Sequence, residues 1–295
     1  MVPITVGVPV YNGADLLDEC LACLARQSFR DFTVLIFDNA STDATPDIAR
    51  AWAARDARFK YMRQPRNVGA IANFRDALLA SDTPWFMWRS HDDYSADNYI
   101  EALYRLATSE RGCELAVPTV VALDLDGGRR PAPPPDPEAF VALRGQFKLL
   151  LNHPGGWFYG LWNAKAARKS CLPVCANYPF ATASEYLTLY GPIMDGAVRG
   201  TAETEIYKRV RRTTTTQAPK IKYTTAESLE IRRAFVRELR RVRSERDLPL
   251  GLRVAHGLFE PFYLRRRLPS LSKIARTWAR NLLGASKRSS TPRPA

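Results

Sequence analysis

The chain has 295 residues, 46% of them hydrophobic, which is enough to bury a sizeable core. Its net charge of +13 is uneven, because residues 205–295 hold 23 basic and 7 acidic side chains (+16), whereas residues 1–204 carry −3. No recognisable nucleic-acid-binding motif accompanies the basic segment, and no stretch reaches the ~18 uninterrupted apolar residues of a membrane span. The composition predicts one enzyme-sized domain with a basic appendage and argues against nucleic acid as a partner.

The N-terminal segment alternates strand and helix patterns. Residues 4–10 form a β-branched run that ends in Tyr11-Asn12-Gly13, a sequence typical of a turn, and residues 14–27 carry helically spaced apolar side chains. Residues 32–37 are apolar without polar alternation, as expected for a strand covered on both faces. These segments predict a βαβ unit.

The same alternation continues to residue 88. A helix is predicted over 45–57, a strand over 59–62, a helix over 70–80 and a strand over 84–88. Each strand is followed by a polar cluster. Because open α/β sheets bind their ligands at the carboxyl ends of the strands, we expect these clusters to meet at one edge.

The last of these clusters contains an acidic pair, Asp92 and Asp93, directly after Ser90 and His91. Carboxylate oxygens suit Mg²⁺, which usually takes one or two protein carboxylates and completes its shell with water and phosphate oxygens. An Asp pair in a turn can instead bond the nearby backbone and hold no metal. The position after a strand favours a metal-diphosphate site.

Four blocks occur in a fixed order: Val8-Pro9-Val10-Tyr11-Asn12, Asp38-Asn39-Ala40-Ser41-Thr42-Asp43, Arg66-Asn67-Val68-Gly69 and His91-Asp92-Asp93. Together they resemble the inverting family 2 glycosyltransferases of the GT-A fold, over roughly residues 2–210. The resemblance implies an α/β fold, with a Rossmann-like mixed sheet flanked by helices and a basic helical C-terminal extension. The expected organisation is a domain over 1–210, with a nucleotide-sugar half (1–110) and an acceptor half (111–210), an extension over 211–285 and a disordered tail over 286–295.

The resemblance also implies an activity. It is the transfer of a sugar from a UDP- or dTDP-sugar to a glycan or lipid-linked acceptor, in a single displacement assisted by Mg²⁺ or Mn²⁺. The implied direct cation ligand is Asp93, with His91 and Asp92 as further candidates. Asp38 would accept a hydrogen bond from the N3–H of uracil or thymine, since a carboxylate is an acceptor-only group. The full implied nucleotide-binding set is Pro9, Tyr11, Asn12, Asp38, Ser41, Arg66, Asn67 and Asp92.

This sequence departs from the family at two positions. The family commonly has an acid two residues before the first Asp, where this chain has Ser90, which weakens the expected ribose contact. The family's catalytic base, usually Asp, matches Glu185 at a predicted helix start, with Asp195 as a fallback. Thr182 and Glu185 also satisfy a helix-capping pattern, which leaves a structural role open.

The aromatic and glycine-rich stretch 155–162 falls where the family binds its acceptor. Trp157 and Tyr159 are the candidate acceptor contacts, because aromatic faces cover apolar sugar surfaces and glycines let the backbone approach closely. Core packing is the simpler account of most aromatic side chains in this stretch.

The basic segment predicts two helices. The first covers 224–243, with Thr224 and Glu227 at capping-box spacing, and the second covers 271–283, with basic residues opposite an apolar stripe. Such a helix suits an anionic lipid surface, although the stripe could also pack on the catalytic domain. We expect peripheral membrane contact through 262–285 and a cytoplasmic protein at the inner face of the membrane, since no signal peptide is recognisable and the five cysteines resemble reduced thiols.

A non-catalytic nucleotide-sugar or glycan binding module with a degenerate GT-A site is the main alternative, because of Ser90 and Glu185. A nucleotidyltransferase would usually carry a glycine- and arginine-rich phosphate loop near the first strand, and Gly13-Ala14-Asp15 is not one. A dinucleotide-dependent oxidoreductase would need a Gly-x-Gly-x-x-Gly turn after that strand, which is absent.

Overall fold

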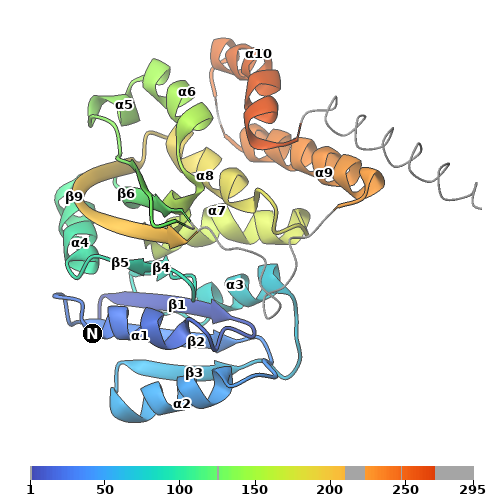
Figure 1. The fold of residues 1–295 in the computed structure, drawn as a ribbon. Coiled ribbons are helices and arrows are strands. Elements are labelled where there is room, and N and C mark those ends of the chain that lie inside the picture. The colour runs from blue at the N-terminus through green and yellow to red at the C-terminus, as the bar shows by residue number, and fades with distance from the viewer. Residues whose placement is uncertain (1, 125, 210–222, 247, 270–295) are drawn as a thin grey trace, which may run out of the picture. The chain divides into compact units, whose positions relative to one another are not determined.

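The structure is a computed structural model that describes residues 2–124, 126–209, 223–246 and 248–269. The chain divides into two compact units, Met1–Arg212 and Thr213–Ala295 (Figure 1). The predicted helix over 271–283 and the predicted disordered tail over 286–295 lie outside the described residues.

The first unit is built on a mixed sheet of nine strands among its described residues. Eight of them follow the order β3-β2-β1-β4-β8-β6-β9-β5, and β7 pairs with β6. The strands are β1 (Ile4–Val10), β2 (Phe32–Asp38), β3 (Phe59–Arg63), β4 (Trp85–Trp88), β5 (Tyr94–Ser95), β6 (Leu115–Leu123), β7 (Arg129–Ala132), β8 (Leu161–Asn163) and β9 (Val198–Arg209).

The N-terminal part of this sheet is parallel. Strand β1 pairs in parallel with β2 and β4, and β2 pairs in parallel with β3. The strands predicted over 4–10, 32–37, 59–62 and 84–88 are confirmed, so the loops after them meet at one edge. Beyond β4 the sheet becomes mixed, because β8 runs antiparallel to both β4 and β6.

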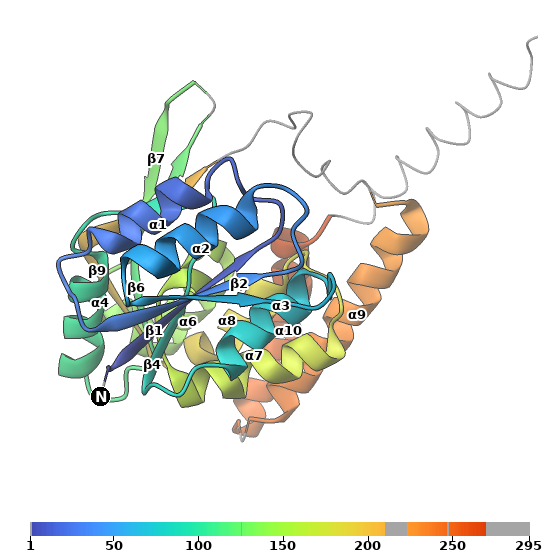
Figure 2. The ribbon, with the colours of Figure 1, turned by 90° about the horizontal axis from the view of Figure 1, so that it is seen from below.

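Helices cover both faces of the parallel strands. Figure 2 shows α1 and α2 on one face and α3 and α7 on the other. All seven residues of β1 are buried, as its uninterrupted apolar sequence predicts. The helices of this unit are α1 (Leu17–Ala25), α2 (Thr45–Arg55), α3 (Ala70–Leu79), α4 (Tyr99–Ser109), α5 (Glu138–Val141), α6 (Leu143–Asn152), the 3₁₀ helix η1 (Gly155–Tyr159), α7 (Ala164–Asn177) and α8 (Ser184–Met194).

The second unit contains two described helices, α9 (Thr225–Ser244) and α10 (Leu250–Arg267). The predicted capping box at the start of α9 is present, since Thr224 and Glu227 each accept a hydrogen bond from the other's backbone N–H. The helix α10 was not predicted. It contacts α9 through an ion pair of Arg240 with the buried Glu260, at 2.7 Å. Among the described residues, no helix has the length and apolar character needed to cross a membrane.

Candidate active site

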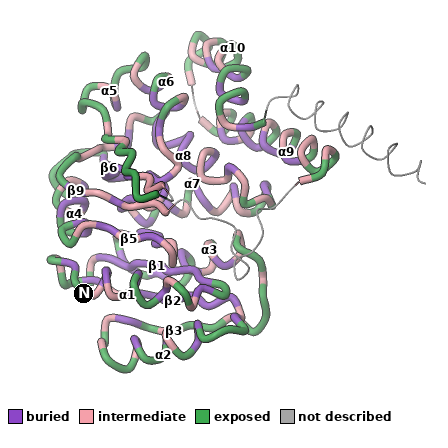
Figure 3. Tube along the Cα trace, viewed as in Figure 1, coloured by how far each residue is buried: buried purple, intermediate pink, exposed green. Residues whose placement is uncertain are grey.

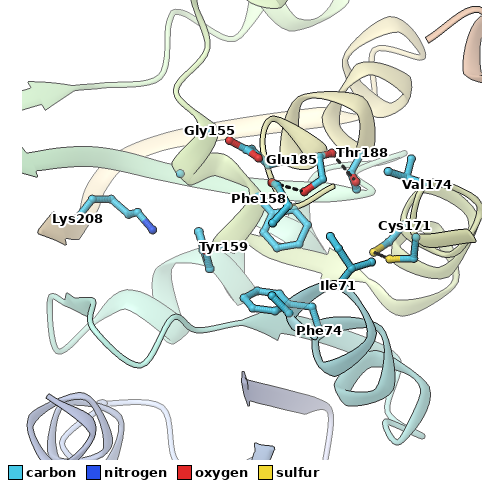
Figure 4. Close-up of a pocket in the computed structure, with 15 residues that line it drawn as sticks. Ile71, Phe74, Gly155, Phe158, Tyr159, Cys171, Val174, Glu185, Thr188 and Lys208 are labelled. Carbon is cyan, nitrogen blue, oxygen red and sulfur yellow. Dashed lines mark hydrogen bonds between the residues drawn. The ribbon is translucent and has the colours of Figure 1, made fainter. Parts of the chain in front are cut away.

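Two neighbouring cavities lie at the carboxyl edge of the parallel strands. Each has a volume of about 350 Å³. The wall of the first cavity includes Pro9, Tyr11, Asn39, Asn67, Ser90 and His91. The wall of the second includes Gly155, Tyr159, Cys171, Cys175, Glu185 and Lys208 (Figure 4). Ala70 and Phe74 of α3 belong to both walls, so the two cavities adjoin.

The first cavity gathers several of the residues predicted to bind a nucleotide. Pro9, Tyr11 and Asn67 are in its wall, whereas Arg66 is exposed and is not. Asn12 and Ser41 are not part of this wall and instead connect two loops. The Asn12 backbone N–H donates a hydrogen bond to Ser41 Oγ at 2.9 Å. This bond ties the loop after β1 to the loop after β2.

The prediction that Asp38 contacts a base is not supported by its surroundings. Its side chain is fully buried and is not part of the cavity wall. Asp38 Oδ2 accepts hydrogen bonds from the Tyr61 hydroxyl at 2.7 Å and from Arg63 at 2.6 Å, and Oδ1 accepts one from the Ser41 N–H at 2.8 Å. This carboxylate stabilises the loop that forms the cavity.

The next residue, Asn39, is part of the cavity wall, whereas Asp38 is not. Its Nδ2 donates to Asn67 Oδ1 at 2.9 Å, and its Oδ1 accepts from the Val68 N–H at 2.8 Å. A primary amide has two N–H groups and two lone pairs on its oxygen, so one donor and one acceptor position remain beyond these two bonds. In the sequence, the only indication that Asn39 belongs to the site is its position beside Asp38.

The acidic pair occupies a turn after β4. Asp92 accepts a hydrogen bond from the Ser90 hydroxyl, so the residue that replaces the family's acid contacts the first Asp. Asp93 is 2% exposed, and its Oδ2 lies 2.5 Å from Lys208 Nζ. Burial raises the pKa of the Asp93 carboxyl, and the Lys208 ammonium offsets only part of that increase.

Lys208 is the most consequential residue that the sequence analysis missed. It projects from β9 toward Tyr159, with its Nζ 3.8 Å from the centre of that ring (Figure 4). Burial by itself lowers the pKa of Lys208, but Tyr159 and the Asp93 carboxylate outweigh burial and hold the pKa above its ordinary value. The ammonium is therefore charged at neutral pH.

The predicted cation site is not ready-made. Among the described residues, no group of three or more His, Cys, Asp or Glu side chains is arranged to hold a metal ion. Asp93 is bound to an ammonium, and the His91 ring packs so closely on Gly13 that a Cβ built there would lie 2.4 Å from His91 Cδ2. Because Asp93 Oδ2 already contacts the Lys208 ammonium, a divalent cation at this oxygen would meet a competing positive charge, and these residues do not fit the ion without rearrangement.

Glu185 lies in the wall of the second cavity, in the first turn of α8. The N-cap residue of α8 is Ala183 and not Thr182, and the side chain of Ala183 makes no capping hydrogen bond. The backbone of Gly155 lies against Glu185, because a Cβ built on this glycine would be 3.2 Å from both Cγ and Oε1. Glycine at 155 leaves room for the carboxylate.

Two other predicted site residues lie away from the cavities. Asp195 is the exposed C-cap of α8, roughly 15 Å along the helix from Glu185, so it cannot serve as an alternative base in the same cavity. Trp157 is 1% exposed and packs on Phe140 and His153, each ring pair being 5.8 Å apart. Of the two predicted acceptor contacts, only Tyr159 is in the wall.

Backbone strain concentrates in the loops around the cavities. In the described part of the chain, three residues other than glycine have positive φ: Asn12 (47°), Ala40 (61°) and Ala183 (64°). This conformation costs an L-residue roughly 1–2 kcal/mol and persists where the surrounding structure holds it. Asn12 follows Tyr11, Ala40 follows Asn39, and Ala183 precedes α8. Each strained residue is therefore next to a residue of a cavity wall.

The parallel strands, their polar loops and the cavities at their carboxyl ends define a nucleotide-binding α/β domain. Residues 5–163, more than half of the chain, match the family described as "Glycosyl transferase family 2". The chain belongs to this family, as its sequence motifs predict.

Three curated relatives match shorter segments. Glycosyltransferase GlyA of Streptococcus pneumoniae serotype 4 is 30% identical over 102 residues, covering 35% of this chain and 14% of GlyA. The protein EpsH of Bacillus subtilis is 32% identical over 104 residues, covering 35% of this chain and 30% of EpsH. Validoxylamine A glucosyltransferase of Streptomyces hygroscopicus is 44% identical over 82 residues, covering 26% of this chain and 19% of that enzyme. The chain thus spans less than a third of the length of each.

Two solved structures share the fold. S. aureus TarS 1-349 in complex with UDP-GlcNAc superposes with a TM-score of 0.62 at 15% identity, covering 84% of this chain and 68% of TarS. Mannosyltransferase PcManGT from Pyrobaculum calidifontis, in complex with GDP-Man and Mn²⁺, gives a TM-score of 0.54 at 16% identity, covering 96% of this chain and 80% of PcManGT. These likenesses confirm the predicted GT-A fold.

Proposed function

We propose that this protein is an inverting glycosyltransferase that binds the nucleotide of a nucleoside-diphosphate sugar in the first cavity and carries out transfer in the second. One observation carries the proposal. The Glu185 carboxylate and the Lys208 ammonium, 23 residues apart in the sequence, line one cavity that adjoins the cavity of the nucleotide-binding motifs. A general base and a positive charge are the two groups that a single displacement at an anomeric carbon requires.

The proposed reaction assigns one step to each group. Glu185 accepts the proton of the acceptor hydroxyl while the oxygen of that hydroxyl forms a bond to the anomeric carbon. The bond from the anomeric carbon to the donor diphosphate oxygen breaks in the same step. Lys208 lies where a positive charge offsets the charge that develops on the leaving diphosphate. The acceptor, a glycan or lipid-linked sugar, would stack on Tyr159 in the same wall.

The family resemblance implies a divalent cation, and the structure of PcManGT is a complex with GDP-Man and Mn²⁺. When bound, Mg²⁺ or Mn²⁺ supplies Lewis-acid charge to a leaving diphosphate. In this chain such a cation would compete with Lys208 for Asp93, and the roles of Glu185 and Lys208 are derived without it.

The amide of Asn39 is the proposed contact to the base. An amide both donates and accepts, so it can pair with the N3–H and O4 of uracil or with the N3 and amino group of cytosine. We expect Asn39→Asp to weaken the binding of both UDP and CDP by about tenfold, because a carboxylate has no N–H group to donate to uracil O4 or to cytosine N3. The Kd values of UDP and CDP, measured by calorimetry, check this. Unchanged Kd values for both nucleotides would remove Asn39 from the base contact.

The proposed activity is tested by release of nucleoside diphosphate from UDP-, dTDP-, CDP- and GDP-sugars, with and without Mn²⁺, in the presence of oligosaccharide acceptors. Release from at least one donor in the wild-type protein, lost in Glu185→Gln, supports a transferase. Binding of a nucleotide without any release would instead support a binding module with a degenerate site.

A further inference from the structure

The exposed face of α10 carries an apolar stripe. Leu250, Val254, Leu258 and Phe262 are 77%, 55%, 72% and 66% exposed, and they recur at every fourth residue. Residues four apart lie on one side of a helix. Figure 3 shows exposed positions recurring along α10. Large apolar side chains gathered on one exposed helix face are typical of an interaction surface and not of an ordinary solvated helix.

The charges of α10 are segregated in a way that identifies the partner. Arg253, Arg265 and Arg266 are exposed beside the stripe. The single acidic residue of α10, Glu260, is instead buried and forms ion pairs with Arg240 at 2.7 Å and with Arg243 at 3.2 Å. The exposed face is therefore apolar and positively charged, with no negative charge of its own.

We propose that this face of α10, defined by Leu250, Val254, Leu258 and Phe262 with the flanking arginines, docks on a membrane surface rich in anionic lipid. The helix would lie in the plane of the interface, with the apolar side chains among the acyl chains and the arginines at the headgroups. A second copy of the chain fits less well, because two such faces would bring like charges together without acidic partners. The surface lies N-terminal to the helix that the sequence predicts over 271–283 and does not depend on it.

All residues of this surface lie in the second unit, and none of them is a proposed catalytic residue. Membrane docking deepens the proposed function only by placing the enzyme where lipid-linked acceptors occur. A membrane test therefore leaves the catalytic assignment untouched, and the two proposals can fail separately.

The test is sedimentation of the full chain with phosphatidylcholine vesicles containing 0 or about 30% phosphatidylglycerol, a headgroup composition that gives a negative surface potential. We expect binding to the anionic vesicles that weakens as NaCl is raised. The double variant Leu258→Ser, Phe262→Ser should bind at least about tenfold more weakly, because two large apolar side chains no longer enter the lipid. The triple variant Arg253→Gln, Arg265→Gln, Arg266→Gln should lose most of the preference for anionic vesicles.

Leu79→Ser is the matched control, because Leu79 is a 52% exposed leucine on α3 of the first unit. Unchanged binding in this control, with an unchanged thermal midpoint in all variants, supports the assignment to α10. Wild-type-like binding in the Leu258 and Phe262 double variant would overturn it, as would equal loss in the Leu79 control. A wild-type dimer in sedimentation velocity that dissociates in the double variant, without vesicle binding, would identify a self-association surface instead.

Discussion

Replacement of Glu185 by Gln is expected to lower the rate of sugar transfer by about 10²–10⁴-fold, the usual contribution of a positioned general base. Glutamine keeps the shape that packs against Gly155 but cannot accept the proton of the acceptor hydroxyl. Nucleotide affinity should stay unchanged, because Glu185 is not part of the wall of the first cavity. The measurement is kcat for the active donor together with the Kd of its nucleoside diphosphate.

Asp195→Asn is the matched control for this variant. It removes the same charge from the other end of α8, where the side chain is exposed. This control should retain wild-type kcat. Transfer that persisted in Glu185→Gln, or a loss of similar size in Asp195→Asn, would contradict the assignment of Glu185 as the base.

Lys208→Met is expected to reduce kcat by at least about 10²-fold, as loss of one electrostatic stabiliser of a developing charge typically does. Methionine keeps much of the length of the lysine side chain and removes the ammonium that lies 2.5 Å from Asp93. The variant also leaves the Asp93 carboxyl buried without this partner. Loss of one partner of a buried ion pair costs about 3–5 kcal/mol of stability, and Asp93→Asn in the same chain should restore part of that stability but not the activity.

The same variant makes a prediction about pH and cations. In Lys208→Met, burial of Asp93 raises its pKa without the offset from lysine, so the native state holds a proton that the unfolded state has released. Stability should therefore fall as pH rises from the ordinary titration range of Asp toward neutral pH. The measurement is the free energy of unfolding of the variant across that pH range.

Mn²⁺ should stabilise the Lys208→Met variant more than the wild-type protein, since Asp93 is no longer bound to an ammonium. Equal effects of Mn²⁺ on both proteins would show that Lys208 and a cation do not compete for Asp93.

Local sequence predicted the parallel half of the sheet because the information there is local. The apolar run of β1 and the turn residues after it lie within ten positions of each other, and the same holds at β2 and β4. The edge at which the loops meet follows from the parallel order alone. The candidate base Glu185 came instead from the family resemblance, which places the base at a helix start, and α8 does begin at Ser184, directly before it.

Contacts between distant parts of the chain account for most of what the sequence did not predict. Asp38 is buried by Tyr61 and Arg63, which follow it by 23 and 25 residues on β3, and no pattern around Asp38 reveals this. Lys208 lies 115 residues after its partner Asp93 and reaches it because β9 pairs with β5, the strand that directly follows Asp93. Helix α10 was missed because Gly251, Gly257 and Pro261 interrupt its helical pattern.

Thermal unfolding of the wild-type protein with UDP, dTDP, CDP, GDP and ADP, each with and without Mn²⁺, tests the central claim most directly. A ligand that binds the native state raises the midpoint by mass action. The first cavity, with Asn39 in its wall, predicts a clear rise with pyrimidine diphosphates that is reduced by Tyr11→Ala, which removes an exposed aromatic from the same wall. An unchanged midpoint with all five nucleotides would contradict a donor site in this cavity.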